Sequence, residues 1–167
     1  AEATALLAAT PGAAPLGGAT DAHVERRAEP APAPVLVSVA AVTELRRITR
    51  DAAGLRIGAG VSLADLADVR DLPDAVTEAV ATIASPQVRN AATVGPCYAV
   101  TGDHRFQHAA VDGHRCQAVT PSDLATVLLA LDADVEIAAA GRVRTVPMAG
   151  FYTGPGETVL RPGELVT

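Results

Sequence analysis

The chain has 167 residues and a formal net charge of −6. Apolar residues make up 49% of the sequence, and aromatic residues only 2%. This length allows a buried core, but the core must be packed with small aliphatic side chains. All 13 basic residues are Arg, which excludes chemistry that needs Lys, such as Schiff-base formation or a phosphate-loop lysine. The negative charge, the lack of a basic stripe and the lack of a long apolar run argue against a nucleic acid or a membrane as partner.

The pattern of residues in the first third of the chain predicts an N-terminal helix, followed by a strand, a glycine turn and a second helix. In chain order we expect a helix over residues 2–10, a strand over 13–16, a helix over 22–27, an extended connector over 30–34, a strand over 35–39, a helical turn over 42–48 and a strand over 55–60.

The turn between the first strand and the second helix is made of small residues. It reads Gly17-Gly18-Ala19-Thr20-Asp21, and Thr20 or Asp21 can cap the helix that follows. Small side chains leave backbone N–H groups accessible, and the start of a helix adds partial positive charge. The turn therefore suits a phosphate or pyrophosphate group, and a capped tight turn without a ligand is the alternative.

The rest of the chain predicts helices followed by antiparallel strands. We expect a helix capped by Ser62, a helix over residues 74–84, a helix from Ser122 or Asp123 to residue 131, a hairpin of 135–139 and 142–146, a helical turn over 148–152 and a final strand from Leu165. This order predicts an α+β fold in two lobes, residues 1–54 and 55–167.

Both cysteines and three of the four histidines lie between Cys97 and Cys116. The segment lacks the C-x2-C pair that marks structural zinc sites, so its residues do not predict zinc strongly. A disulfide between Cys97 and Cys116 is a further alternative. Two cysteines are too few for a disulfide framework, which favours a cytoplasmic location.

Several stretches in one order carry a family resemblance. They are LGGATDAHVERR, LRIGAGVSLADLAD, IASPQVRNAATVG, CQAVTPSDLATVLLALDADVEI and RTVPMAGFYTGPGETVLRPGELVT. Together they resemble the FAD-binding domain of the molybdenum hydroxylase family, which includes the medium subunit of carbon monoxide dehydrogenase and the flavin part of xanthine dehydrogenase. The resemblance implies the two-lobed α+β fold of that domain, without the C-terminal domain that follows it in the family.

The resemblance also implies where FAD would lie. The cofactor would sit between the lobes, and no residue of this chain would act as a catalytic acid or base. The implied contacts are Gly17, Gly18, Ala19, Thr20, Asp21 and Ala22 at the pyrophosphate, Thr93 and Gly95 at the phosphates and ribityl chain, Ser122, Asp123 and Leu124 beside the ribityl and adenosine parts, and Leu165 or Val166 near the ring.

Two positions depart from the family pattern. Ala19 stands where the second glycine of a pair is usual, and Ala tolerates positive φ poorly. Gly95 is followed by Pro96 and Cys97 where the family continues Gly-Asn, and Pro removes an amide donor.

The second departure has a counterpart in one branch of the family. The flavin subunits of 4-hydroxybenzoyl-CoA reductase and of a periplasmic aldehyde oxidoreductase carry a loop at this point that holds a [4Fe–4S] cluster. Here Cys97 would be a single remaining ligand, and one thiolate cannot hold such a cluster. A metal role for Cys97 is expected only if the native chain has a loop between Gly95 and Cys97; the alternative is that the loop was lost. This branch makes the periplasm the alternative location.

The function implied by the resemblance is electron transfer. Electrons would pass from a large subunit with the molybdenum cofactor, through a small [2Fe–2S] subunit, to FAD in this chain and on to an acceptor. The alternatives are a degenerate scaffold or small-molecule-binding protein without redox activity, and a stand-alone flavoenzyme.

Overall fold

The computed structural model describes residues 2–20, 35–95, 107–111, 114–117, 123–154 and 157–167. The helices and 3-10 turns are α1 (Glu2–Ala9), η1 (Thr43–Arg46), α3 (Leu63–Ala67), α4 (Asp74–Thr82), α5 (Pro86–Arg89), α6 (Asp123–Ala130) and η2 (Met148–Gly150). The strands are β1 (Ala14–Leu16), β2 (Leu36–Ser38), β3 (Ile48–Asp51), β4 (Gly54–Ile57), β5 (Gln107–Val111), β6 (His114–Gln117), β7 (Asp134–Ala139), β8 (Arg142–Pro147), β9 (Tyr152–Gly154), β10 (Glu157–Thr158) and β11 (Leu165–Val166).

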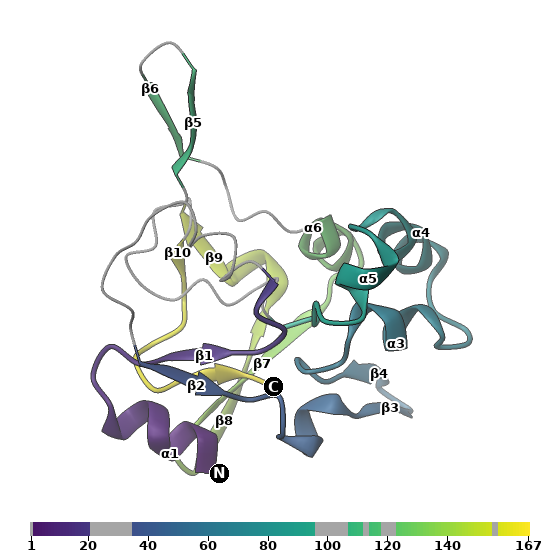
Figure 1. Cartoon of the computed structure of the whole chain (residues 1–167). Coiled ribbons are helices and arrows are strands. Elements are labelled where there is room, and N and C mark those ends of the chain that lie inside the picture. Colours follow the sequence, from purple (N-terminus) through teal and green to yellow (C-terminus); the bar gives the residue numbers. More distant parts are fainter. Residues whose placement is uncertain (1, 21–34, 96–106, 112–113, 118–122, 155–156) are drawn as a thin grey trace.

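The strands form small separate sheets rather than one large sheet. β1 pairs in parallel with β2, with Ala14 opposite Leu36. β7 and β8 form the predicted antiparallel hairpin, and β11 adds to the other edge of β7. β3 pairs with β4, and the hairpin of β5 and β6 projects from the rest of the chain (Figure 1). This mixture of helices and small sheets confirms the predicted α+β class.

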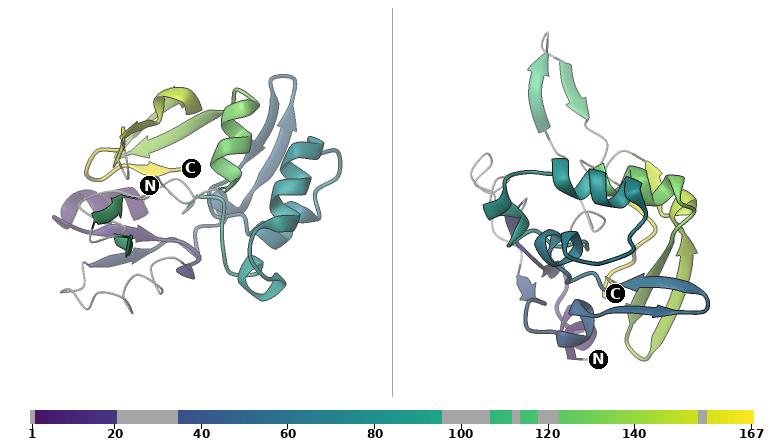
Figure 2. Two further views of the ribbon diagram at one scale, coloured as in Figure 1. Left: turned by 90° about the horizontal axis from the view of Figure 1, so that it is seen from above. Right: turned by 90° about the vertical axis from the view of Figure 1, so that its right-hand side faces the viewer.

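Helices α3 to α6 gather at one end of the molecule, and α1 with β1 and β2 lies at the other (Figure 1). The view from above shows the same separation (Figure 2). The β7–β8 hairpin and β11 run between the two groups (Figure 1).

Two clusters of buried apolar side chains correspond to this arrangement. The larger one is centred on fully buried Leu66, Val80 and Phe151 from three separate segments. The smaller one joins Leu7, Val39, Leu45 and Leu165, so the end of the sequence packs against its beginning. Two lobes divided at residue 54 stay a prediction.

Several details of the predicted elements are wrong. The helical turn expected over residues 148–152 ends at Gly150, and Tyr152 instead begins β9. The helical turn expected over residues 42–48 ends at Arg46, and Ile48 instead begins β3, opposite Ile57. The strand expected over 55–60 ends at Ile57. β3 was missed because three of its four residues are exposed, so its sequence carries no apolar alternation.

The short helix α5 was also missed. Its start is set by Ser85, whose hydroxyl accepts a hydrogen bond from the Val88 N–H at 3.4 Å, and by Pro86 in the first turn. These are ordinary helix-start signals, but four residues give no helical period to detect.

Several predictions fall outside the described residues, namely the helix over 22–27, the connector over 30–34, and Asp21, Ala22, Cys97 and Ser122. In the described ranges no cluster of three metal-ligating side chains is present. No helix of the described chain is long and apolar enough to cross a bilayer.

Candidate functional site

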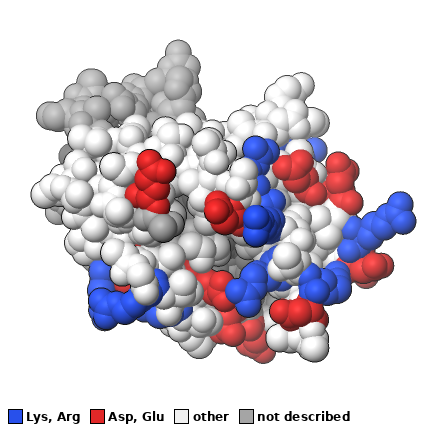
Figure 3. Space-filling model, turned by 90° about the horizontal axis from the view of Figure 1, so that it is seen from below, with Lys and Arg blue, Asp and Glu red and all other residues white. Residues whose placement is uncertain are grey.

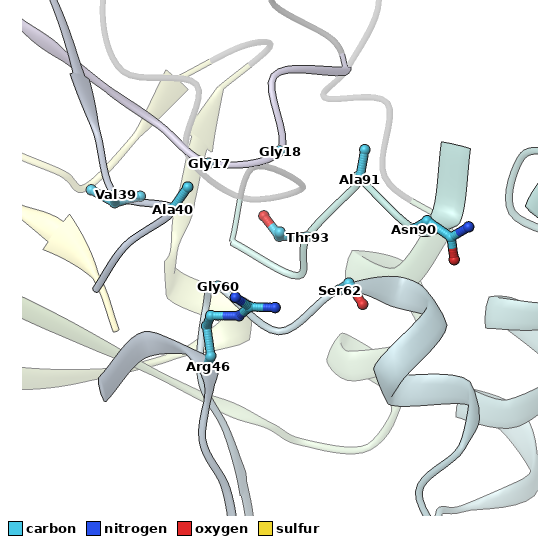
Figure 4. Close-up of a pocket in the computed structure, with 10 residues that line it drawn as sticks. All are labelled: Gly17, Gly18, Val39, Ala40, Arg46, Gly60, Ser62, Asn90, Ala91 and Thr93. Atoms are coloured by element: carbon cyan, nitrogen blue, oxygen red, sulfur yellow. The ribbon is translucent and has the colours of Figure 1, made fainter. Parts of the chain in front are cut away.

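A pocket of about 160 Å³ lies where four chain segments from different parts of the sequence meet, namely residues 17–18, 39–46, 60–62 and 90–93 (Figure 4). The described residues that line it are Gly17, Gly18, Val39, Ala40, Arg46, Gly60, Ser62, Asn90, Ala91 and Thr93. Most of them have small or short polar side chains. Much of the wall is therefore backbone.

The first wall is the glycine turn that follows β1. If Gly18 carried a Cβ atom, that atom would lie 1.9 Å from the Ala91 carbonyl oxygen and 2.8 Å from the Ala91 carbonyl carbon. No other residue type fits at this distance from a neighbouring backbone. Gly18 thus brings the predicted first contact turn directly against the loop that contains the predicted second one.

The second wall is the loop from Asn90 to Gly95. Three backbone hydrogen bonds hold this loop against the segment 59–63. The Leu63 N–H donates to the Ala92 oxygen at 2.9 Å, the Val94 N–H to the Val61 oxygen at 2.9 Å and the Gly95 N–H to the Ala59 oxygen at 2.6 Å. A Cβ at position 95 would lie 2.6 Å from the Ala59 Cβ. Gly95 is therefore needed for packing beneath the pocket and does not itself line it.

The start of this loop is fixed from the other side by Arg89. Its Nη1 donates to the carbonyl oxygens of Ala81, Ile83 and Ala84 at 3.2, 2.9 and 2.9 Å. The guanidinium thereby satisfies carbonyl groups at the C-terminal end of α4. Asn90 and Ala91 follow Arg89 directly and line the pocket, so these hydrogen bonds hold the start of the loop in place.

Ala19 has a left-handed backbone conformation with φ of +61°. A non-glycine residue in this region carries a steric penalty of about 1 to 2 kcal/mol. The sequence comparison with the family pattern indicated such a conflict, and the structure locates it next to the pocket turn. Ala19 directly follows Gly18, whose backbone lies against that of Ala91, so the strained residue lies next to this close backbone contact.

The predicted contact residues divide into those the structure gathers and those it does not. Gly17, Gly18 and Thr93 line one pocket, and Ala19 and Thr20 continue the same turn. Leu124 and Leu165 are buried in the two apolar clusters, and Asp123 is an exposed residue at the start of α6. A contact of Asp123, Leu124 or Leu165 with a cofactor stays a prediction.

Sequence reasoning missed several lining residues, above all Arg46, Gly60 and Asn90. Gly60 was detectable, because the Gly58-Ala59-Gly60 spacing after a strand signals close backbone approach. The Gly60 N–H donates to the Leu45 carbonyl oxygen at 2.7 Å, which brings η1 to the pocket. No local pattern in the sequence around Arg46 indicates that this residue lines the same pocket as Gly17, which lies 29 residues earlier.

The pocket is small, and its described lining residues carry one formal charge and a few neutral polar groups. Of the ten described lining residues Arg46 alone is ionised at neutral pH, while Ser62, Asn90 and Thr93 offer neutral polar groups. Such a set of donors suits an anionic, oxygen-rich group of modest size. None of these ten described residues is a cysteine, histidine, aspartate, glutamate or lysine.

Comparisons with known proteins agree on one family. Its sequence model, described as the FAD-binding domain in molybdopterin dehydrogenase, matches residues 1–167. The xanthine dehydrogenase FAD-binding subunit of Escherichia coli O157:H7 is 35% identical over 171 residues, which cover 99% of this chain and 52% of that protein. The aldehyde oxidoreductase FAD-binding subunit PaoB of Escherichia coli (strain K12) is 37% identical over 152 residues, covering 70% of this chain and 48% of that protein.

Solved structures give the same result. A carbon monoxide dehydrogenase chain from Hydrogenophaga pseudoflava superposes with a TM-score of 0.80 at 26% identity, over 99% of this chain and 53% of that one. Quinoline 2-oxidoreductase from Pseudomonas putida 86 has a TM-score of 0.77 at 23% identity, a likeness of fold alone. The chain spans about half the length of the bacterial FAD-binding subunits and structures named here. The match over the whole sequence, together with the fold and the glycine-walled pocket, shows that this chain belongs to the family of FAD-binding domains of molybdopterin dehydrogenases.

Proposed function

We propose that this chain binds FAD with the diphosphate part of the cofactor in the pocket between the Gly17-Gly18 turn and the loop from Asn90 to Thr93, and that it serves as an electron-transfer module. The observation that carries the proposal is the meeting of these two segments in one pocket. They are more than 70 residues apart in sequence, and the resemblance implied phosphate contacts for Gly17 and Gly18 in the first segment and for Thr93 in the second.

The residues present fit part of such a cofactor. Gly17 and Gly18 place backbone rather than side chains at the wall, and a Cβ at Gly18 would collide with Ala91. The volume of about 160 Å³ is below the roughly 300 to 1,000 Å³ typical of pockets for whole drug-sized ligands. The pocket therefore matches a phosphate-sized section of a dinucleotide, and the remaining sections would extend beyond it.

Bound FAD supplies the redox chemistry, as a carrier that accepts and releases electrons. The residues of the chain bind, orient and shield it. The rigid support from Arg89, Ala59 and Gly95 favours this role, because a positioned cofactor requires walls that do not rearrange.

We further propose the partners that the family resemblance implies. These are a large subunit with the molybdenum cofactor and a small subunit with [2Fe–2S] clusters, which would deliver electrons to FAD in the cytoplasm. The relatives at 35% and 37% identity are FAD-binding subunits by name, which supports an assembly with further subunits. A [4Fe–4S] cluster in this chain stays tied to an additional loop before Cys97.

The test is a visible absorption spectrum of the purified chain after incubation with FAD and gel filtration, combined with an iron assay. We expect bound flavin, released as FAD on denaturation, and no stoichiometric iron. A colourless protein that cannot be reconstituted would contradict the proposal and favour a scaffold that has lost its cofactor. Native mass measurement from the source organism then separates a subunit of a larger complex from a stand-alone flavoenzyme.

A further inference from the structure

Arg46 reaches the pocket from the end of η1. Figure 4 shows its side chain passing Gly60, with the guanidinium directed toward the side of the pocket formed by Ser62 and Thr93. The glycine turn lies across the pocket from it. The one cation of the described wall thus faces the neutral backbone that the proposed function assigns to phosphate.

The backbone under Arg46 is fixed. Leu45, the preceding residue, is 4% exposed in the smaller apolar cluster. Its carbonyl oxygen accepts the Gly60 N–H at 2.7 Å, and a Cβ at Gly58 would lie 2.2 Å from the same oxygen. Because η1 and the segment 58–60 are in backbone contact, Arg46 is held beside the pocket before any ligand arrives.

The charge of Arg46 is not used within the described part of the fold. No hydrogen bond or ion pair joins its guanidinium to another described residue. By contrast, Arg56 pairs with Glu136 and Arg144 pairs with Glu164. The nearby acid Glu44 has a lowered pKa, chiefly through a hydrogen bond from the backbone and with smaller contributions from Thr43 and Arg47.

One face of the molecule shows how its surface charges are distributed. On the face drawn in Figure 3, basic and acidic side chains are intermixed and form no extended positive area. Exposed charges more than about 10 Å away are screened at 0.1 M salt, so a charged group next to the pocket acts on a bound anion more strongly than distant surface charges do.

We propose that Arg46 binds the diphosphate of the dinucleotide opposite the Gly17-Gly18 turn, and that it makes the pocket selective for flavins that carry this group. The inference rests on the proposed function and names the residue that neutralises the ligand. Guanidinium suits this task, because its planar fork of donors matches two phosphate oxygens at once and it stays charged at all relevant pH values. Backbone amides can donate hydrogen bonds to the diphosphate but cannot cancel its charge.

Two properties follow that a purely structural Arg46 would not show. The affinity for FAD should fall with rising ionic strength more steeply in the wild-type chain than in Arg46→Gln. The preference for FAD over riboflavin, which has no phosphate, should shrink in the variant.

The experiment compares wild type with Arg46→Gln, Arg46→Lys and the control Arg47→Gln by flavin fluorescence titration with FAD and riboflavin at 50 and 500 mM NaCl. Arg47 is the neighbouring exposed arginine that does not line the pocket, so its variant changes net charge by the same amount. We expect about tenfold weaker FAD binding for Arg46→Gln at low salt, unchanged riboflavin binding, partial retention in Arg46→Lys and little change in Arg47→Gln.

Equal losses in the two glutamine variants would overturn the inference, because the effect would then be one of net charge. Unchanged FAD affinity in Arg46→Gln, or an equal loss for riboflavin, would overturn it as well. Each variant is checked by its thermal midpoint, and Arg46→Lys provides the same salt comparison if Arg46→Gln does not fold. A wild-type chain that binds no FAD would instead overturn the proposed function, and the inference with it.

Discussion

Gly18→Ala should damage both stability and cofactor binding, for one steric reason. The added Cβ would stand 1.9 Å from the Ala91 carbonyl oxygen, whereas ordinary contacts begin at 3.4 Å. The two pocket walls would have to separate by about 1.5 Å. Overpacking of this kind costs about 1 to 3 kcal/mol, and reduced freedom of the unfolded chain returns about 0.4 to 1 kcal/mol. The difference gives a net loss of up to about 2.6 kcal/mol in the free energy of unfolding.

Urea unfolding followed by circular dichroism measures the stability change, and FAD titration measures binding. Because the loops that move are the pocket walls, FAD affinity should fall about tenfold or more. Gly141→Ala is the matched control, since Gly141 has φ of +74° in the β7–β8 turn and nothing lies within 4 Å of an added Cβ. It should cost about 1 kcal/mol through backbone strain alone and leave FAD affinity unchanged.

The reasoning is refuted if Gly18→Ala keeps both the wild-type urea midpoint and the wild-type FAD affinity. That result would mean that the two walls do not approach at backbone distance. A loss of stability equal to that of Gly141→Ala, without any loss of affinity, would likewise separate the turn from the binding site.

Three further substitutions test other parts of the structure by urea unfolding. Ala19→Gly should stabilise the chain by about 0.5 kcal/mol, because relief of the left-handed strain exceeds the entropy that glycine adds to the unfolded state; a lower urea midpoint would contradict the strain. Glu164→Gln should cost about 1 to 2 kcal/mol at pH 7, since the carboxylate accepts two hydrogen bonds from Arg144 at 3.0 and 2.6 Å in a mostly buried position. The hydrogen bond from Arg144 lowers the pKa of Glu164 below 4.5, so this stabilisation is complete above pH 4.5 and is lost as the pH falls through the lowered pKa; the wild type and the variant should converge there. Glu136→Gln should cost less than about 1 kcal/mol, because its partner Arg56 is 62% exposed, and a larger loss would show that this pair is not a surface pair.

The sequence predicted those elements that have a strong local pattern. The β7–β8 hairpin joins two six-residue strands across the Ala140-Gly141 turn, and Ser62 caps α3 with a hydrogen bond from the Asp65 N–H at 2.9 Å. β3 and α5 escaped because four residues, mostly exposed, contain no period to recognise. Local pattern thus decided which elements could be predicted.

The pocket was only half predictable for a different reason. Gly17, Gly18 and Thr93 carry a recognisable pattern, so each could be assigned separately. Arg46 and Asn90 reach the same pocket through tertiary contacts: the Leu45 carbonyl against Gly60, and Arg89 across the end of α4. Such contacts join residues that are distant in sequence, and no periodicity or capping rule encodes them.

The glycines and the small size of most described lining side chains have one common explanation. Gly18 against Ala91, Gly58 against Leu45 and Gly95 against Ala59 are all contacts in which a glycine backbone meets another backbone or a methyl group. These segments can converge this closely only where side chains are missing, and their convergence leaves a wall in which peptide groups are prominent. A wall of peptide groups offers many dipoles but no net charge, so a doubly charged ligand would need a cation from outside the glycine segments. Arg46 is the described lining residue that meets this need, because it projects from η1, the segment that Gly58 and Gly60 bring to the edge of the pocket.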